Sequence, residues 1–196
     1  MDLSKSFEYF DPSTVRGKCH IIGCGSVGST VAENLARLGI KRFVLYDFDT
    51  VEPHNIANQM FVAADIKSKK VDALKRIIES INPDASATIE IFDEGYTNQR
   101  LNGYVFLCVD NIDLRRKICE DNRRNQSIKA AFDFRTRLED AQHYAAVWKD
   151  LKQVDNMIAT MNFTHDEAHA VTPTTACGTT LGVAATVRMV SELGVC

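Results

Sequence analysis

The sequence has no pair of cysteines in C-x-x-C spacing, although six of its 196 residues are cysteines. A zinc site built from two such pairs is therefore excluded. Reduced thiols fit these cysteines better than a disulfide framework. No apolar stretch approaches the ~20 residues of a membrane span, and residues 1–10 lack the basic start and apolar core of a secretory signal. These absences predict a protein of the cytoplasm with no membrane contact.

Basic patches are also missing. The net charge is -3 and no lysine- or arginine-rich block stands out, which argues against nucleic acid as the partner. The hydrophobic content of 45% and the charged content of 25% are those of an ordinary globular protein. A chain of 196 residues fits a single domain and is long enough to bury a core.

The first informative motif is a glycine turn formed by Gly23, Gly25 and Gly28 in G-x-G-x-x-G spacing. It follows a short apolar strand expected at residues 19–24 and opens a helix expected at residues 29–38. Glycines let backbone N–H groups approach a phosphate, and a helix N-terminus favours its negative charge. The turn predicts a nucleotide site, but by itself it does not separate ATP enzymes from dehydrogenases and flavoproteins.

The next strand, expected at residues 42–46, ends in an acidic run. Asp47 lies about 20 residues past the glycines, where a carboxylate accepts hydrogen bonds from ribose hydroxyls. The run continues to Gln59 and resembles the D-x-D-x-V-x-x-x-N-x-x-R-Q pattern of the ThiF/MoeB/HesA family, which are ubiquitin-activating-enzyme-like adenylyltransferases. The matching residues are Asp47, Asp49, Val51, Asn55 and Gln59. Asn58 stands where the family places arginine.

This resemblance implies a set of ATP-binding residues. It implies that the glycine turn and Asp49 help to bind the nucleotide, that Asp47 holds the ribose, and that Gln59 orients the site. It assigns Asn55 and Lys70 to the triphosphate. The chain is then a short form of the family, without the zinc-binding cysteine pairs that many members have.

A lysine cluster at residues 67–70 precedes a helix expected at residues 71–81. Cations at the positive end of a helix dipole are unfavourable unless an anion lies nearby. A bound triphosphate would explain them, with Lys70 matching the family's ATP-contacting lysine. The alternative interpretation is a solvated basic turn.

Asp110 follows a strongly apolar strand expected at residues 104–109 and precedes a helix expected at residues 112–125. The carboxyl end of a central strand is where open α/β sheets bind ligands. The resemblance implies that Asp110 binds the Mg²⁺ of the nucleotide, as in the family's T-D-N motif. The alternative is that Asp110 caps the following helix.

The second half of the chain carries weaker signals. Strands expected at residues 128–134 and 142–148 would pair antiparallel. Between them, Arg135 and Arg137 either steer an acidic partner tail or phosphates, or are exposed charges at a turn. The spacing of His165 and His169 could suggest a metal, but H-D-E-A-H is not the H-E-x-x-H motif.

The end of the chain is expected to complete the domain. Residues 149–176 show no pattern and match the family's crossover loop, and residues 177–193 match its closing helix. Cys177 at that helix start is either nucleophilic or structural. Left uncovered, the apolar positions of the closing helix would form an exposed patch, so we expect a homodimer.

Together these features predict one domain of residues 1–196: a lead-in (1–18), a nucleotide-binding core (19–148), the crossover loop and the closing helix. The fold class is α/β, a Rossmann-like doubly wound sheet with a parallel N-terminal half and antiparallel strands in the C-terminal half. The resemblance implies ATP- and Mg²⁺-dependent adenylation of the C-terminal carboxylate of a small ubiquitin-fold carrier protein that ends in glycine.

Two absences favour a second hypothesis. Asn58 lacks the charge of the family arginine, and residues 1–18 contain no R-Y-x-R-Q-like motif to reach a neighbouring subunit's ATP. The chain could therefore be a nucleotide-binding interaction protein with little chemistry. A third hypothesis, an NAD-dependent oxidoreductase, leaves the run from Asn55 to Gln59 unexplained.

Overall fold

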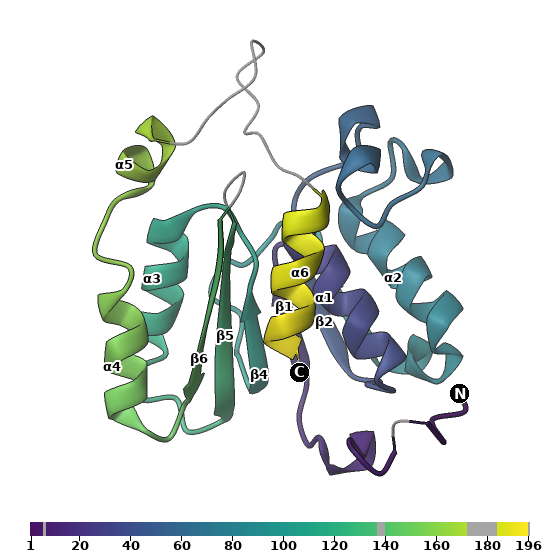
Figure 1. Cartoon of the computed structure of the whole chain (residues 1–196), viewed down its shortest axis with the longest axis horizontal. Coiled ribbons are helices and arrows are strands. Elements are labelled where there is room, and N and C mark those ends of the chain that lie inside the picture. The colour runs from purple at the N-terminus through teal and green to yellow at the C-terminus, as the bar shows by residue number, and fades with distance from the viewer. Residues whose placement is uncertain (6, 137–139, 172–183, 196) are drawn as a thin grey trace.

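The computed structural model describes residues 1–5, 7–136, 140–171 and 184–195. Its centre is a six-stranded sheet in the order β3-β2-β1-β4-β5-β6 (Figure 1). The strands are β1 (Cys19–Ile22), β2 (Phe43–Tyr46), β3 (Ile89–Phe92), β4 (Gly103–Leu107), β5 (Ile128–Thr136) and β6 (Ala141–Val147). The first five are parallel, and β6 pairs antiparallel with β5. The predicted fold class is confirmed.

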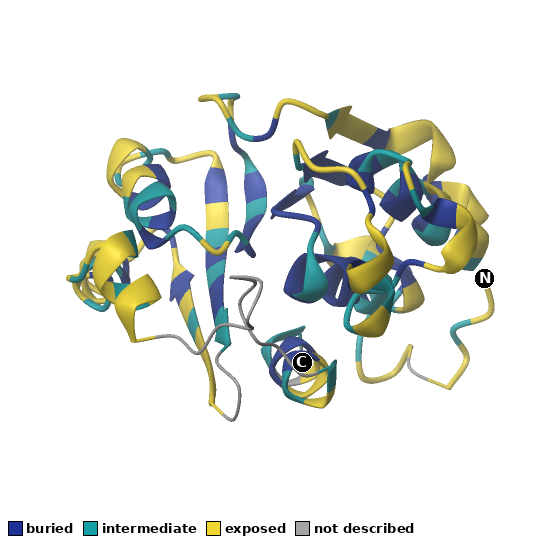
Figure 2. Cartoon of the chain, turned by 90° about the horizontal axis from the view of Figure 1, so that it is seen from above, coloured by how far each residue is buried: buried dark blue, intermediate teal, exposed yellow. Residues whose placement is uncertain are grey.

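Helices cover both faces of the sheet. They are α1 (Ser26–Arg37), α2 (Lys70–Ile81), α3 (Ile112–Asp121), α4 (Leu151–Ala159), α5 (His165–Ala170) and α6 (Ala184–Val195). The core cluster on one face includes residues of α1, α2 and α6, and the cluster on the other face includes residues of α3 and α4 (Figure 1). Figure 2 shows buried residues along the strands and on the inward sides of these helices.

The central strands are apolar because both of their faces are buried. Ile21 and Phe106 point to the side of α1, whereas Ile22 and Leu107 point to the side of α3. All four residues of β1 and all four of β2 are buried. Parallel strands covered on both sides have this continuous apolar character, which explains why they were recognisable in the sequence.

The sequence predicts no regular pattern for residues 149–176, but their described part, residues 149–171, contains the helices α4 and α5. Asp150 caps α4 by accepting hydrogen bonds from the backbone N–H groups of Lys152 and Gln153. Val154 and Met157, at helical spacing, are buried against the cluster that includes Trp148. A second helix, α5, begins with a capping box between Thr164 and Glu167. The start of the expected closing helix and Cys177 lie outside the described residues.

The reason given for a homodimer does not hold for Val187 and Val190 in the described part of the closing helix, although Met189 is 62% exposed. Helix α6 is covered within its own chain, since it packs against α1, β5 and β6 (Figure 1). Its residues Val187 and Val190 are each 2% exposed. A Cβ on Gly194 would lie 2.1 Å from the Phe134 ring, so glycine allows α6 to approach β5 closely. The homodimer stays a prediction without this argument.

No helix among the residues that the model describes is long and apolar enough to cross a membrane.

Candidate nucleotide site at the carboxyl edge of the sheet

The glycine turn joins β1 to α1 at the point where the strand order reverses. From β1 the chain continues outward to β2 and β3, whereas β4 and β5 lie on the other side of β1. In such sheets the crevice beyond the carboxyl ends of the strands is the usual ligand position. We call the carboxyl ends of β1, β2 and β4, with the loops that follow them, the carboxyl edge.

Each glycine of the turn meets a different environment. Gly23 has φ +93°, and a Cβ there would lie 2.8 Å from the backbone of Cys108 and Val109. A Cβ on Gly28 would lie 1.8 Å from the carbonyl oxygen of Gly23, so α1 packs directly on the turn. A Cβ on Gly25 would meet nothing within 4 Å. The first and third glycines therefore serve close packing, and the second leaves open space.

The N-terminus of α1 faces this open space without a side-chain cap. Gly25 is the N-cap residue of this 12-residue helix, and among the described residues no side-chain cap bonds to its first N–H groups. Uncapped N–H groups at a helix start carry partial positive charge and attract anions. The geometry of the turn thus fits a phosphate group, as the sequence predicted.

Asp47 ties the end of β2 to the glycine turn. One carboxylate oxygen accepts from the N–H of Cys24 at 2.7 Å, and the other accepts from the N–H of Asp49 at 2.9 Å. Burial raises the pKa of Asp47, while the nearby charge of Lys70 and the two N–H groups oppose that increase. Each oxygen retains a second lone pair, so the predicted contact with ribose hydroxyls stays compatible with these bonds.

Lys70 is buried rather than part of a solvated basic turn. Its Nζ lies 2.6 Å from an oxygen of Asp49, and the two side chains are 9% and 49% exposed. Lys69 donates to the carbonyl oxygen of Phe48 at 2.9 Å. Two lysines at the start of α2 therefore bind the loop after β2, which explains part of the basic cluster without a ligand. The Lys70 ammonium keeps further donors for a phosphate.

Asn55 and Gln59 lie on the short helix η2 (Pro53–Ala57) and just after it. Asn55 is 5% exposed, and its side-chain oxygen accepts from the N–H of Glu52 at 2.9 Å. The oxygen Oε1 of Gln59 is buried and has no hydrogen-bond partner among the described residues. Asn58 is half-buried, and its side chain makes no hydrogen bond to another described residue. These residues shape the loop beside Lys70.

Asp110 does not cap α3, because Asn111 does. The side-chain oxygen of Asn111 accepts from the N–H of Leu114 at 2.9 Å. Asp110 is exposed and makes no hydrogen bond or ion pair with another described residue. The alternative interpretation from the sequence is therefore wrong, and the Asp110 carboxylate is available for a ligand.

The donor set fits Mg²⁺ bound with a nucleotide. Among the described residues no group of three or more histidine, cysteine, aspartate or glutamate side chains could hold a metal by itself. Mg²⁺ usually takes only one or two protein carboxylates and completes its shell with phosphate oxygens and water. One unpartnered carboxylate, that of Asp110, near an open phosphate cradle matches that preference.

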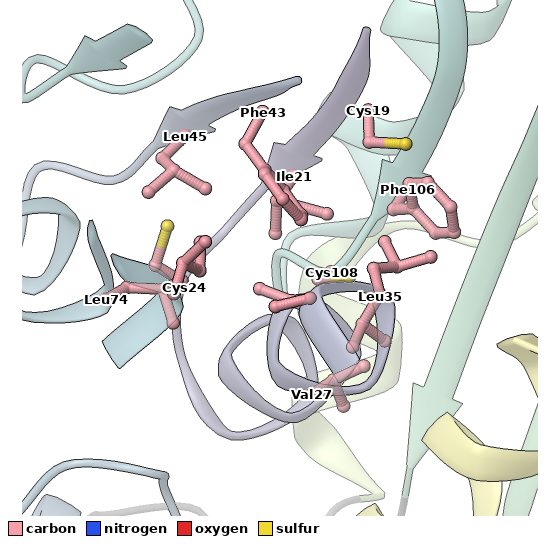
Figure 3. Close-up of a cluster of buried hydrophobic side chains, with 14 of the residues drawn as sticks. Cys19, Ile21, Cys24, Val27, Leu35, Phe43, Leu45, Leu74, Phe106 and Cys108 are labelled. Atoms are coloured by element: carbon pink, nitrogen blue, oxygen red, sulfur yellow. The ribbon is translucent and has the colours of Figure 1, made fainter. Parts of the chain in front are cut away.

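The cysteines beside the site pack as small apolar side chains. Figure 3 shows Cys24 near Leu45 and Leu74, and Cys108 beside α1. Burial raises the pKa of Cys108 to about 12 and raises that of Cys24 well above its ordinary value. A thiol with so high a pKa stays protonated near neutral pH and is a poor nucleophile. Cys177 lies outside the described residues, so both of its alternatives stay open.

Arg135 lies at the carboxyl end of β5 and is held by contacts within the chain. It donates to Asp133 at 2.7 Å and to both oxygens of Thr160 at 2.9 and 2.8 Å, and its guanidinium lies over the Tyr144 ring. Neither sequence interpretation fits, because Arg135 is neither an exposed turn charge nor a free cation. Arg137 lies outside the described residues.

Sequence reasoning missed a buried ionic group next to the site, formed by Arg115 and Asp133. Arg115 is 6% exposed and Asp133 is 0% exposed. A signal was present, since Arg115 lies three residues after Ile112 and three before Ile118, on the apolar stripe of α3. A charged residue on that stripe indicates a buried partner.

A doubly wound sheet with an uncapped helix start and an open glycine turn at its switch point defines an α/β protein of the Rossmann-like class. Residues 13–133 match the model of the ThiF family. The match covers more than half of the 196 residues, so the chain belongs to the ThiF family.

The chain is also similar to named proteins. It is 32% identical over 144 residues to the ubiquitin-like modifier-activating enzyme 5 of Drosophila mojavensis, covering 64% of this chain and 35% of that protein. The enzyme of the same name from Rattus norvegicus is 36% identical over 115 residues, covering 50% of this chain and 28% of that protein. The chain thus spans about a third of the length of these relatives.

Solved structures support the fold at lower identity. A structure of E. coli MccB with AMPCPP and MccA has a TM-score of 0.67 at 18% identity, covering 94% of this chain and 55% of that one. A structure of PaaA has a TM-score of 0.67 at 19% identity, covering 92% of this chain and 54% of that one. At such identities the likeness shows the fold alone.

Proposed function

We propose that this chain binds Mg-ATP and transfers its adenylyl group to the C-terminal carboxylate of a small ubiquitin-fold carrier protein. The observation that carries the proposal is the set of groups at the carboxyl edge: the open glycine turn with its uncapped helix start, Asp47, Lys70 and the unpartnered Asp110. They supply donors for phosphates, an acceptor for ribose hydroxyls, a cation and a metal ligand. A dinucleotide requires neither the cation nor the metal ligand.

The residues would act by position and charge. In the reaction, a carboxylate oxygen of the carrier attacks the α-phosphorus of ATP, a bond forms between them, and the bond to pyrophosphate breaks. The N–H groups of the glycine turn would hold the phosphates, and Lys70 would offset the charge that grows on the leaving pyrophosphate. Asp49 keeps Lys70 in place through their 2.6 Å contact. Asn55 and Gln59 would complete the triphosphate side of the site.

Asp110 would hold Mg²⁺, which when bound supplies charge neutralisation to the phosphate oxygens. The carboxylate needs no rearrangement for this role, since no other described residue competes for it.

The nature of the carrier follows from the relatives. Two proteins similar to this chain are named ubiquitin-like modifier-activating enzyme 5, and one similar structure contains MccB with AMPCPP and MccA. We infer that the partner here is a small protein with a ubiquitin fold and a C-terminal glycine. The proposal includes a cytoplasmic location and a homodimer.

A second candidate is a nucleotide-binding protein of the same fold with little chemistry. Asn58 favours it, because asparagine cannot give the bidentate, charge-assisted contact of the family arginine to a leaving phosphate. The Asn58 side chain makes no hydrogen bond to another described residue that would give it a different structural role.

ATP–pyrophosphate exchange, measured with carrier proteins that end in glycine, tests the proposal. We expect Asp110→Ala to abolish carrier-dependent exchange while weakening ATP binding much less, because Mg²⁺ stabilises charge that builds up as pyrophosphate leaves. Asp84→Ala is the matched control, since Asp84 is exposed and forms only a surface ion pair with Lys41. Its exchange rate should equal that of the wild type.

Asn58→Arg separates the two candidates. If the site is otherwise catalytic, the added cation raises the exchange rate. Binding of ATP by both wild type and Asn58→Arg, with no exchange for any carrier tested, would favour the binding protein. Stabilisation of the chain by NAD, with none by Mg-ATP, in thermal-shift titrations would reject the proposed adenylyl transfer.

A further inference from the structure

Arg115 on α3 joins the ends of two strands beside the site. Its Nε donates to the carbonyl oxygen of Val109 at 2.6 Å, and Nη2 donates to the same oxygen. Its Nη1 donates to the carbonyl oxygens of Leu107 at 3.2 Å and Phe134 at 2.5 Å, and to the Asp133 carboxylate. One guanidinium therefore holds the carboxyl end of β4 against that of β5.

The guanidinium is buried together with its counter-charge. The Arg115 side chain is 7% exposed and that of Asp133 is 0% exposed, and the second oxygen of Asp133 accepts from Arg135. A buried ion pair adds little net stability compared with apolar residues of similar volume, because both charges lose their hydration. A gain in stability therefore does not by itself explain why Arg115 is buried here and donates to carbonyl oxygens at the ends of two strands.

The contacts of Arg115 fix the backbone next to Asp110. The residue before it, Val109, has its carbonyl oxygen held by two donors of Arg115. The residue after it, Asn111, is held as the cap of α3. Between these fixed neighbours the Asp110 side chain is exposed and unpartnered among the described residues. Hydrogen bonds therefore hold the backbone on both sides of Asp110, while the Asp110 carboxylate itself is free for a ligand.

We propose that Arg115 is a positioning residue for a divalent cation that Asp110 holds together with the phosphates of ATP. This inference rests on the proposed function. The Asp133 carboxylate, which Arg115 shares with Arg135, offsets part of the positive charge beside the Val109 carbonyl that Arg115 fixes. Groups that hydrogen-bond a metal ligand directly contribute about 10- to 100-fold to metal affinity, and Arg115 would act one residue away, through the Val109 carbonyl oxygen.

Arg116 provides a matched control on the same helix. It also donates to two carbonyl oxygens, those of Met161 at 2.6 Å and Phe163 at 3.3 Å, and to the carboxylate of Asp113. These bonds tie α3 to the connection between α4 and α5 rather than to the end of β4. Losing an arginine fork should disturb α3 in both variants, but only Arg115 contacts the residue before Asp110.

The test is a Mg²⁺ titration at fixed ATP, followed by thermal shift, with wild type, Arg115→Lys and Arg116→Lys. Lysine keeps the charge but cannot hold several carbonyls at once. The Mg²⁺ midpoint is the Mg²⁺ concentration that gives half of the full thermal shift. We expect Arg115→Lys to raise this midpoint about tenfold or more, and Arg116→Lys to have a midpoint close to that of the wild type. Binding of ATP in the presence of EDTA, measured by calorimetry, should be the same in all three. Equal Mg²⁺ midpoints for wild type and Arg115→Lys, or equal increases in both variants, would overturn the inference.

Arg115→Gln is the second variant if Arg115→Lys does not fold. It leaves Asp133 paired with Arg135 alone and so leaves no buried charge unpaired. The same increase in Mg²⁺ midpoint is expected, against Arg116→Gln as control, and an unchanged midpoint would again overturn the inference. A wild-type chain that binds ATP equally with and without Mg²⁺ would instead reject the metal site of the proposed function.

Discussion

At the carboxyl edge, single polar side chains hold neighbouring segments of the chain together. Asp47 joins the end of β2 to the glycine turn, and Asp49 holds Lys70 through a 2.6 Å contact. Asn111 caps α3 and so leaves Asp110 free. Because Asn111 is the cap, the Asp110 carboxylate has no structural contact among the described residues, whereas Asp47 and Lys70 both have contacts within the chain.

The glycines give a prediction at this scale. Gly28→Ala would place a Cβ 1.8 Å from the Gly23 carbonyl oxygen, and we expect it to destabilise the protein by about 2 kcal/mol or more, because backbone must move. Gly25→Ala meets nothing within 4 Å and should cost under about 1 kcal/mol. Its methyl group would instead enter the phosphate cradle and weaken ATP binding.

Urea denaturation and ATP titration of the two variants distinguish these roles. The interpretation is contradicted if Gly25→Ala binds ATP as tightly as the wild type, or if Gly28→Ala is as stable as Gly25→Ala.

At the scale of elements, the helices at the end of the chain complete the covering of the β5–β6 half of the sheet. Helix α4 packs against β6 on the side of α3, and α6 packs against β5 and β6 on the side of α1. Each face of the antiparallel pair is therefore contacted by a helix from the end of the chain, although most residues of β6 stay exposed. A sheet with one bare face would leave an apolar patch exposed to water.

Two variants of α4 test its packing. Met157 is 3% exposed, and we expect Met157→Ala to cost about 2–5 kcal/mol of the free energy of unfolding, because it leaves a cavity. Leu151, at the start of the same helix, is 41% exposed, and Leu151→Ala should cost under about 1 kcal/mol. Equal losses in urea denaturation would show that α4 does not pack on the sheet as described.

At the scale of the whole molecule, stability should fall in mild acid because β1 buries a histidine. His20 is 1% exposed, its Nδ1 lies 2.9 Å from the Tyr46 hydroxyl, and its Nε2 accepts from the N–H of Asn102. Burial, helped by the charge of Lys18, lowers the pKa of His20 from 6.5 to about 4. Between these two pH values the unfolded chain binds a proton at this residue and the folded chain does not.

The free energy of unfolding should therefore decrease as the pH falls through 6.5 towards 4. From pH 7.5 to pH 5 the contribution of His20 is about 2 kcal/mol. The measurement is urea denaturation at both pH values for the wild type and His20→Gln. The variant should lose about 2 kcal/mol less than the wild type over this interval, and an equal loss would show that His20 titrates normally in the folded protein.

The sequence by itself determined the features that depend on local pattern. Apolar runs identified the central strands β1, β2 and β4, because strands buried on both faces need continuous apolar residues. The glycine spacing identified the turn, because only glycine fits where Gly23 and Gly28 lie, and its phosphate binding stays a prediction. The polar residues of α4 hid a helix whose apolar positions, including Val154 and Met157, do have helical spacing.

Only the tertiary structure decided which partner each polar group takes. Nothing in the local sequence shows that Lys70 pairs with Asp49, that Arg135 faces Thr160, or that Arg115 reaches the end of β5. These contacts join residues on different elements, and their geometry is set by the twist of the sheet and the packing of helices on it. Hydrogen bonds require atoms within about 3 Å, and that distance is fixed by packing across the fold rather than by sequence spacing.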